Sequence, residues 1–382
     1  MKRKNIGTVT VLLIILTFVS ACERDEFNWG TKVGNITYSG NVVFLGTSEL
    51  SLIKEISGEQ IIFTGETGEI KNIADKSILV MGISEKTPYG ALRKVTSIQN
   101  NNTEIVIATD NATLEEAIKE GTVNFQAKLL EKNFKLKFKT EGVIASGVNK
   151  SFDGLAVTLD KFEIFKDGAR NAVLNGAVGI SPEIGLTIKI GSNKISEIRV
   201  VTTLNKIDEL TIVSNGALGG SNEVIAAEFI HSPVIIDSLI FVPEVTISCG
   251  FQGTASSEVT SGVRQDRSLT SKLTYSKSKW TEDQLIHNES FDYIRPSVTE
   301  NSDLDVFSGP EIRILLFGIP VQIVKATGFY SLQVEKNASP LWRLFIGNDG
   351  QNTAKAGILG SPSDYTANLD LEPSEIGNSN SK

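Results

Sequence analysis

Two histidines are the only candidates in the sequence for the base of a nucleophilic triad. His231 follows the apolar run 224–230 and is predicted to end a strand, whereas His287 lies in the polar stretch 283–289 and is predicted to be exposed. A serine nucleophile needs a base held beside it, and the chain contains no Gly-x-Ser-x-Gly elbow. We therefore predict no catalytic residue of this class.

Metal binding has one weak candidate. Zinc sites need several Cys or His at short spacing, which two separate histidines and two cysteines do not provide. Calcium prefers clustered oxygen ligands, and Asn301-Ser302-Asp303-Leu304-Asp305 places acids at alternate positions. A plain acidic turn explains this run more simply, so we predict no metal ligand and no cofactor.

A carboxylate pair for glycoside hydrolysis stays open, because its two acids can be far apart in sequence and no pattern singles them out. The chain has no glycine-rich loop between a strand and a helix, which argues against nucleotide binding. An extracellular polysaccharide-acting enzyme is therefore kept as an alternative function, with its residues unassigned.

The N-terminus carries the clearest chemical signal. Residues 1–4 are basic, an apolar run extends from Val9 to Val19, and small residues precede Cys22. These are the parts of an export signal. A membrane-spanning helix needs about 20 apolar residues, roughly twice the length of this run. We predict a cleaved signal over residues 1–21.

Val19-Ser20-Ala21-Cys22 resembles the lipobox of bacterial lipoproteins. The resemblance implies that the Cys22 sulfur receives a diacylglycerol and that the freed amine can be acylated, for example with palmitate. Two or three acyl chains hold a protein firmly on a membrane, since each buried CH₂ contributes about 0.8 kcal/mol. An ordinary secretory signal with a chance cysteine is the alternative.

The residues after Cys22 bear on the membrane in which the protein would be anchored. Glu23 stands where an Asp would resemble an inner-membrane retention signal, and Glu23, Asp25 and Glu26 loosely resemble surface-export signals. We expect a lipid-anchored protein of the outer membrane or cell surface. The leaflet and the oligomeric state stay open.

Charge and cysteine content narrow the partners. Three of the 37 Lys and Arg lie in the signal, so 34 remain against 45 Asp and Glu, a net charge of −11. This balance opposes binding to nucleic acid. If Cys22 carries lipid, Cys249 has no partner for a disulfide and is predicted to be a small buried thiol in a strand.

The chain divides into predicted regions. Residues 22–38 read as a tether, 39–130 as a small β-rich domain, 131–372 as a long-stranded antiparallel domain, and 373–382 as a disordered tail. Short apolar runs separated by turn residues favour strands. The clearest of these runs in the small domain are 42–45, 60–63, 78–81 and 104–107.

One short helix is expected near residues 113–120. Thr113 and Glu116 match a capping box, and Gly121 stands where a helix would stop. Apolar and basic residues alternate in the segment 134–139, which predicts a half-solvated strand rather than a nucleic-acid-binding stripe.

Dipeptides that favour tight turns recur through the long-stranded domain. They are Asp153-Gly154, Asp167-Gly168, Asn175-Gly176, Ser192-Asn193, Asn215-Gly216 and Asp349-Gly350. The predicted fold class is therefore mainly β, as an antiparallel sandwich, roll or open barrel.

Two segments carry a further resemblance. Residues 78–98, followed by Ala112-Thr113-Leu114-Glu115-Glu116-Ala117-Ile118, are similar to a block of secreted, β-rich microbial surface proteins of uncharacterised function, with "G-x-L-R-K-V" and "A-T-L-E-E-A-I" motifs. Residues 308–319 resemble their C-terminal strand. The resemblance implies a surface location and a β-rich fold, and it transfers no catalytic residue. We expect Arg93 or Lys94 to pair with Glu115 or Glu116.

The leading hypothesis is a non-enzymatic adhesin, or a binding or structural module of the envelope. Its partners would be the membrane, through the lipid anchor, and a glycan or an envelope protein. Trp280 and Trp342 are candidates for stacking on a glycan, although a place in the core suits either residue better. An apolar-ligand carrier with an internal tunnel is a third hypothesis. The ligand-binding residues are left unassigned.

Overall fold

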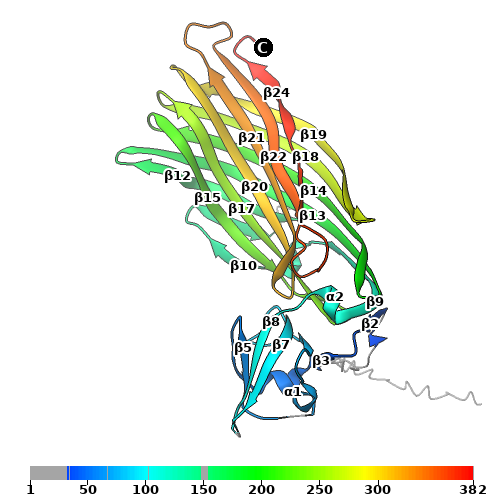
Figure 1. Ribbon diagram of the computed structural model, residues 1–382. Coiled ribbons are helices and arrows are strands. Elements are labelled where there is room, and N and C mark those ends of the chain that lie inside the picture. The colour runs from blue at the N-terminus through cyan, green and yellow to red at the C-terminus, as the bar shows by residue number, and fades with distance from the viewer. Residues whose placement is uncertain (1–31, 34, 67, 102, 148–153, 382) are drawn as a thin grey trace, which may run out of the picture.

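Antiparallel strands make up most of the chain, as predicted (Figure 1). The computed structural model describes residues 32–381 except positions 34, 67, 102 and 148–153. The predicted signal, Cys22 and the first part of the tether lie outside the described residues. Two nine-stranded sheets, here called sheet I and sheet II, face each other above a smaller six-stranded N-terminal sheet.

Sheet I contains the longest strands of the molecule. Its main path is β1 (Lys32–Val33), β2 (Ile36–Tyr38), β9 (Ile118–Lys128), β13 (Arg170–Gly191), β14 (Lys194–Ser214), β18 (Val259–Ser276) and β19 (Lys279–Ser297). Off this path, β12 (Leu155–Asp167) pairs with β13 and with β11 (Val143–Gly147). The long strand β13 therefore has β14 along one side and β9 and β12 along the other.

Sheet II is built from the second half of the chain and one earlier strand. Its main path is β10 (Phe134–Lys139), β15 (Leu218–His231), β17 (Leu239–Ala255), β20 (Ser302–Leu316), β21 (Ile319–Val334), β22 (Trp342–Ala354) and β23 (Tyr365–Asn368). The short strand β16 (Val234–Ile236) pairs with β17, and β24 (Leu371–Asn378) pairs with β22.

Regular alternation explains the length of these strands. In β14, buried and more exposed side chains alternate through most of its 21 residues, which places one face in the core and the other in solvent. The β13–β14 turn is made by Ser192 and Asn193, with φ values of 52° and 58°. Such paired positive φ values give a tight hairpin whose twist matches the strands.

The N-terminal sheet packs on both of its faces. In spatial order it is β3 (Val42–Leu45), β6 (Ile78–Met81), β7 (Ala91–Asn100), β8 (Ile105–Asn111), β5 (Gln60–Phe63) and β4 (Ile53–Ile56). All four residues of β6 are buried, because Ile78 and Val80 join the core of the sandwich while Leu79 and Met81 join a separate small core. The sandwich therefore rests on one face of this sheet.

Four short helical turns accompany the sheets. They are the α-helices α1 (Thr47–Leu50) and α2 (Leu114–Ala117) and the 3₁₀ turns η1 (Ile70–Asn72) and η2 (Glu131–Asn133). No helix in the described part of the chain is long and apolar enough to cross a membrane.

Glu115 on α2 fastens the small region to the sandwich. Its carboxylate accepts hydrogen bonds from the backbone N–H of Ile195, at 2.7 Å, and of Ser361, at 2.9 Å. The amide of Asn193 donates to the backbone oxygens of Glu115 and Ile118, both at 3.2 Å. These contacts join α2 to the β13–β14 turn and to the loop before β23.

The predicted domain boundaries need two corrections. The small domain does not extend to residue 130, because β9 pairs with β13 and is a strand of sheet I. The tether does not extend to residue 38, because β1 and β2 are also strands of sheet I. In both cases distant strands provide the pairing partners, which the local sequence pattern does not reveal.

The predicted helix and tail also differ from the structure. The capping box of Thr113 and Glu116 is confirmed, but α2 ends at Ala117 and strand β9 begins at Ile118, so Gly121 does not stop the helix. The predicted disordered tail does not begin at residue 373, since β24 extends over Leu371–Asn378 and pairs with β22. Backbone pairing orders this polar segment despite its lack of apolar pattern.

The turn predictions divide in a similar way. Tight turns are confirmed at Asp167-Gly168 and Ser192-Asn193, whereas Asn215-Gly216 forms a bend that leads from β14 of sheet I to β15 of sheet II. Asn175-Gly176 and Asp349-Gly350 instead lie inside β13 and β22. At Gly176 a Cβ atom would lie 2.8 Å from the backbone carbon of Glu209, so close strand approach rather than a turn requires this glycine. Residues 151–153, which include the predicted turn residue Asp153, are not described.

Candidate functional site

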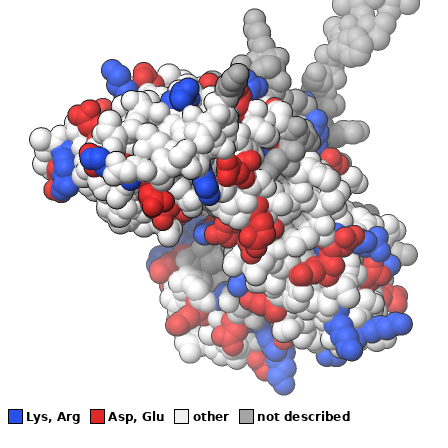
Figure 2. Space-filling model, turned by 90° about the horizontal axis from the view of Figure 1, so that it is seen from above, with Lys and Arg blue, Asp and Glu red and all other residues white. Residues whose placement is uncertain are grey.

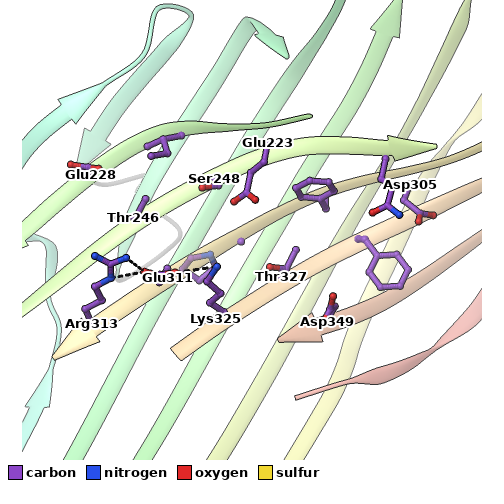
Figure 3. A pocket seen from close by; sticks show the side chains of 16 residues that line it. Glu223, Glu228, Thr246, Ser248, Asp305, Glu311, Arg313, Lys325, Thr327 and Asp349 are labelled. Carbon is purple, nitrogen blue, oxygen red and sulfur yellow. Dashed lines mark hydrogen bonds and ion pairs between the residues drawn. The ribbon is translucent and has the colours of Figure 1, made fainter. Parts of the chain in front are cut away.

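A groove of about 590 Å³ opens on the outer face of sheet II (Figure 3). It crosses five neighbouring strands, β15, β17, β20, β21 and β22. Its lining is formed by Glu223, Ile225, Glu228, Thr246, Ser248, Gln252, Asp305, Phe307, Gly309, Pro310, Glu311, Arg313, Lys325, Thr327, Phe329 and Asp349.

Strand alternation directs these side chains outward. On β20, Val306 and Ser308 are buried between the sheets, whereas Asp305 and Phe307 are partly exposed on the opposite face. A two-residue period of this kind gives one strand two chemically different faces. The groove residues therefore share strands with the core but do not belong to it.

Two phenylalanines of the groove occupy paired positions on neighbouring strands. Phe307 on β20 is directly opposite Phe329 on β21. The row continues through glycines, with Gly250 opposite Phe307 and Gly347 opposite Phe329, and ends at Glu223 opposite Gly250. We call these five residues the aromatic row.

The glycines make room for the rings. A Cβ atom on Gly250 would lie 2.7 Å from Cζ of Phe307, and one on Gly347 would lie 2.8 Å from Cε1 of Phe329. Each ring therefore leans over a neighbouring strand that has no side chain at that point. Partly exposed rings that lean on a sheet form a flat apolar surface suited to stacking.

Carboxylates surround the aromatic row. Glu223 ends the row, Asp305 lies two residues before Phe307, and Asp349 lies two residues after Gly347. Among the described residues these three carboxylates have no ion-pair partner. Burial raises the pKa of Asp305 above its ordinary value, and the charge of Asp303 raises it further, while a hydrogen bond with Ser331 opposes the shift.

At the other end of the groove the charged groups form ion pairs within the protein. Glu311 forms ion pairs with Arg313 and with Lys325, the latter at 3.2 Å, and Figure 3 shows Glu311 between these two cations. Glu228 is 3.7 Å from Lys137 of β10. The charged groups at this end satisfy one another, in contrast to those at the aromatic row.

A second polar cluster lies between the sheets and is closed to solvent. Lys206 is 2.8 Å from Asp208, and both side chains are almost fully buried. Ser308 donates a hydrogen bond to Asp208 at 2.6 Å, and Lys206 donates to the backbone oxygen of Ser308 at 2.7 Å. We call Lys206, Asp208, Arg267 and Ser308 the interior cluster.

Arg267 extends the interior cluster toward β22. It donates to Asn348 at 3.1 Å and also bonds Gln265. Burial lowers the pKa of Arg267 to about 10 and lowers that of Lys206, while Asp208 opposes both shifts. Since each charged group is held by protein partners in the core, we assign the interior cluster a structural role.

Most single residues marked by the sequence lie apart from the groove. His231 ends β15 as predicted and is buried, with its ring against Phe134. His287 lies exposed on β19, as predicted. Cys249 is buried in β17, and burial raises its thiol pKa to about 12.

The acidic segment 301–305 and the two candidate tryptophans lie in different parts of the structure. Asp303 and Asp305 lie on β20, and Asp305 lines the groove. No described group of three or more His, Cys, Asp or Glu residues is arranged to hold a metal ion. Trp342 is 4% exposed and belongs to the core, whereas Trp280 stacks on Tyr365 with ring centroids 5.6 Å apart.

The segments 78–98 and 112–118, which carry the resemblance to surface proteins, contact each other in the structure. Lys94 pairs with Glu116 at 2.8 Å, as expected. Arg93 is buried, however, and donates to Thr109 at 3.2 Å rather than to Glu115. Glu115 serves instead as the link to the sandwich described above.

The segment 134–139 forms β10, but it is more exposed than a half-solvated strand. Leu136 and Phe138 are 46% and 47% exposed, because β10 is an edge strand that pairs with β15 along one side.

Basic and acidic side chains are interspersed on the face of the molecule shown in Figure 2.

Sequence patterns alone do not single out Phe307 or Phe329. Both lie in ordinary alternating strands, where a phenylalanine fits the core or the surface equally well. The available signal is glycine inside a strand, at Gly250 and Gly347, which marks a close approach. The phenylalanine opposite each glycine can be identified only when the strand register is known.

The groove can bind a ligand by stacking on the two rings and by hydrogen bonding to the carboxylates, the amide of Gln252 and the hydroxyls of Ser248 and Thr327. Flat apolar surfaces with polar groups at their edges suit ligands that have both apolar and hydroxyl faces. Comparisons with protein-family models, with curated proteins and with solved structures find no match to this chain.

Proposed function

We propose that this protein is a lipid-anchored module of the bacterial envelope that binds a glycan, without catalysis, in the groove on sheet II. The observation that carries the binding role is the adjacent pair Phe307 and Phe329, which leans over Gly347 and Gly250 on the outer face. Sugar rings have an apolar face that stacks on aromatic rings and hydroxyls that bond to carboxylates and amides.

The anchor is supported by sequence only. Val19-Ser20-Ala21 before Cys22, together with the basic and apolar segments ahead of it, supports lipidation of Cys22 and an outer-membrane or cell-surface address. Mass spectrometry of the N-terminal peptide from native membranes tests this part. A diacylglyceryl-modified Cys22 supports the anchor, and an unmodified Cys22 or an intact signal contradicts it.

Binding is tested by presenting the protein to a panel of immobilised glycans. Phe307→Ala and Phe329→Ala are expected to weaken binding by about ten-fold each, because loss of one stacking contact removes about 1–1.5 kcal/mol. Phe291→Ala is the matched control, since Phe291 is 51% exposed on β19, outside the groove. Equal binding by all three variants would rule out the groove.

A second candidate is a polysaccharide-acting enzyme. The specific observation is Asp305, a groove carboxyl with a raised pKa, in the same groove as Glu223. A raised pKa suits a general acid, and a second carboxylate could act as base or nucleophile. Reducing ends released by the native protein but not by Asp305→Asn would replace the binding role with this one.

The apolar-carrier hypothesis gains no support from the core. The buried side chains between the two sheets comprise a large apolar cluster and the polar interior cluster, and the groove opens on the opposite face of sheet II. A carrier would bury its ligand among inward-facing Val, Ile and Leu side chains, whereas the interior cluster places Lys206, Asp208 and Arg267 between the sheets.

A further inference from the structure

The distribution of charge along the groove indicates which glycans it can hold. This inference rests on the proposed function and concerns the ligand of that same groove. The aromatic row carries Glu223 at one end, with Asp305 and Asp349 beside it on β20 and β22. A ligand stacked on Phe307 and Phe329 would lie among these three carboxylates.

Strand geometry places the acids within reach of one bound ligand. Neighbouring strands are about 4.8 Å apart and residues rise about 3.3 Å along a strand. Asp305 is two residues from Phe307 on β20, which corresponds to roughly 7 Å between their Cα atoms. Glu223 lies two strands from Phe307, which corresponds to roughly 10 Å.

The lining of the groove has five acids and two cations, so its cations do not balance these acids. Arg313 and Lys325 both form ion pairs with Glu311 at the other end of the groove. An anionic sugar at the aromatic row would therefore meet three carboxylates. A cationic sugar would gain from these charges and from the π-faces of the two rings.

We infer that the aromatic row selects glycans with protonated amino groups, such as glucosamine oligosaccharides, over neutral glycans and rejects glycans that contain uronic acids. The environment of Asp305 agrees with this selection. Its pKa is raised by burial and by the charge of Asp303, two residues away on the same strand, and its cross-strand neighbours, Gln252 and Ser331, carry no charge. A bound ammonium group would offset the repulsion that this carboxylate experiences.

The test uses three ligands of similar length at mildly acidic pH and low salt, with affinities measured by calorimetry. They are a β-1,4-linked glucosamine oligosaccharide, its fully N-acetylated form and an oligogalacturonate. We expect the amino form to bind roughly ten-fold tighter than the N-acetylated form, since each exposed charge pair contributes up to about 1 kcal/mol. We expect no binding of the oligogalacturonate, and a loss of the preference at high salt.

The charge contribution is isolated with the double variant Glu223→Gln and Asp349→Asn, which leaves both rings in place. It should bind the amino and N-acetylated forms with similar affinity. Glu209→Gln is the matched control, because Glu209 is an exposed acid on the outer face of sheet I, and it should retain the preference.

The outcomes separate this inference from the proposed function. If the N-acetylated form or the oligogalacturonate binds the native protein as tightly as the amino form, the charge selection is wrong and glycan binding stands. If the double variant retains the full preference, the selection does not come from these carboxylates and the inference is also overturned. If neither these ligands nor any glycan of the wider panel binds, both the inference and the proposed function fail.

Discussion

The core face of β20 and the aromatic-row end of its outer face place charged groups in different surroundings. Toward the core, Asp208 and Lys206 reach Ser308 on β20, and each charged group has a partner. On the outer face of the same strand, Asp305 has no ion-pair partner within the described residues. It lies two residues before Phe307, on the same face of β20. Partnered charges in a core specify packing, whereas unpartnered charges beside exposed rings are available to a ligand.

Removal of Asp208 should give the largest loss of stability, and it tests the role of charges on the core face. Asp208→Ala leaves Lys206 and Arg267 buried without their carboxylate, so we expect the free energy of unfolding to fall by about 3–5 kcal/mol. Chemical denaturation measures it. Asp349→Ala in the groove is the control, with an expected change within about 0.5 kcal/mol. Similar losses in both variants would remove the distinction between the two faces.

The glycine on the inward face gives the next largest effect. A Cβ atom on Gly328 would lie 2.9 Å from Oδ2 of Asp208 and even closer to Arg267. Gly328→Ala should therefore overpack the interior cluster and cost about 1–3 kcal/mol of stability. Gly357→Ala is the control, since a Cβ there meets nothing within 4 Å. A melting temperature for Gly328→Ala equal to that of the control would show that the side chains of the interior cluster can move aside without a loss of stability.

The buried thiol next to the interior cluster should add a pH dependence. Folding raises the pKa of Cys249 from 9.0 to about 12, so the folded chain keeps a proton that the unfolded chain loses. The stability contributed by the neutral thiol is complete well below pH 9 and is lost as the pH rises through 9 toward 12. Between pH 9 and pH 10 the loss should be about 1 kcal/mol.

Denaturation at a series of alkaline pH values measures this loss as the difference between the native chain and Cys249→Ala. The Ala variant lacks the thiol and should show a shallower decline, whatever its stability at neutral pH. Parallel curves for the two proteins would mean that Cys249 titrates equally in the folded and unfolded chains.

The glycine on the outward face should have the smallest effect on stability. A Cβ on Gly347 would push the ring of Phe329 away from the sheet, but this ring can move into solvent. We expect Gly347→Ala to lower stability by less than about 1 kcal/mol and to weaken glycan binding several-fold. Gly328→Ala should show the reverse pattern. Native affinity in Gly347→Ala would show that the position of the ring does not matter for binding.

Local patterns were sufficient for the elements and insufficient for their partners. The alternation in β14, the capping box at Thr113 and the turn at Ser192-Asn193 depend on neighbours in sequence, so the fold class could be predicted. The strand pairing of residues 371–378 and the place of β9 in sheet I depend on distant segments. Such pairing is decided by which strands meet in three dimensions.

The candidate site was harder to predict for the same reason. Phe307 and Phe329 are 22 positions apart in the sequence and become neighbours only through the β20–β21 register. Their exposed faces depend on two further strands that contribute glycine at the matching positions. A ligand surface formed by one residue from each of several strands leaves no motif in a linear sequence.

The link made by Glu115 has a mechanical consequence. Strand β9 follows α2 directly, and the carboxylate of Glu115 joins that helix to the β13–β14 turn, so tension applied to the six-stranded N-terminal sheet enters sheet I at the ends of its strands. Hydrogen bonds between long antiparallel strands pulled along their length share the load and must break together. A force between the N-terminal sheet and the far end of sheet I would therefore load these hydrogen bonds in shear, where they yield together and not one by one.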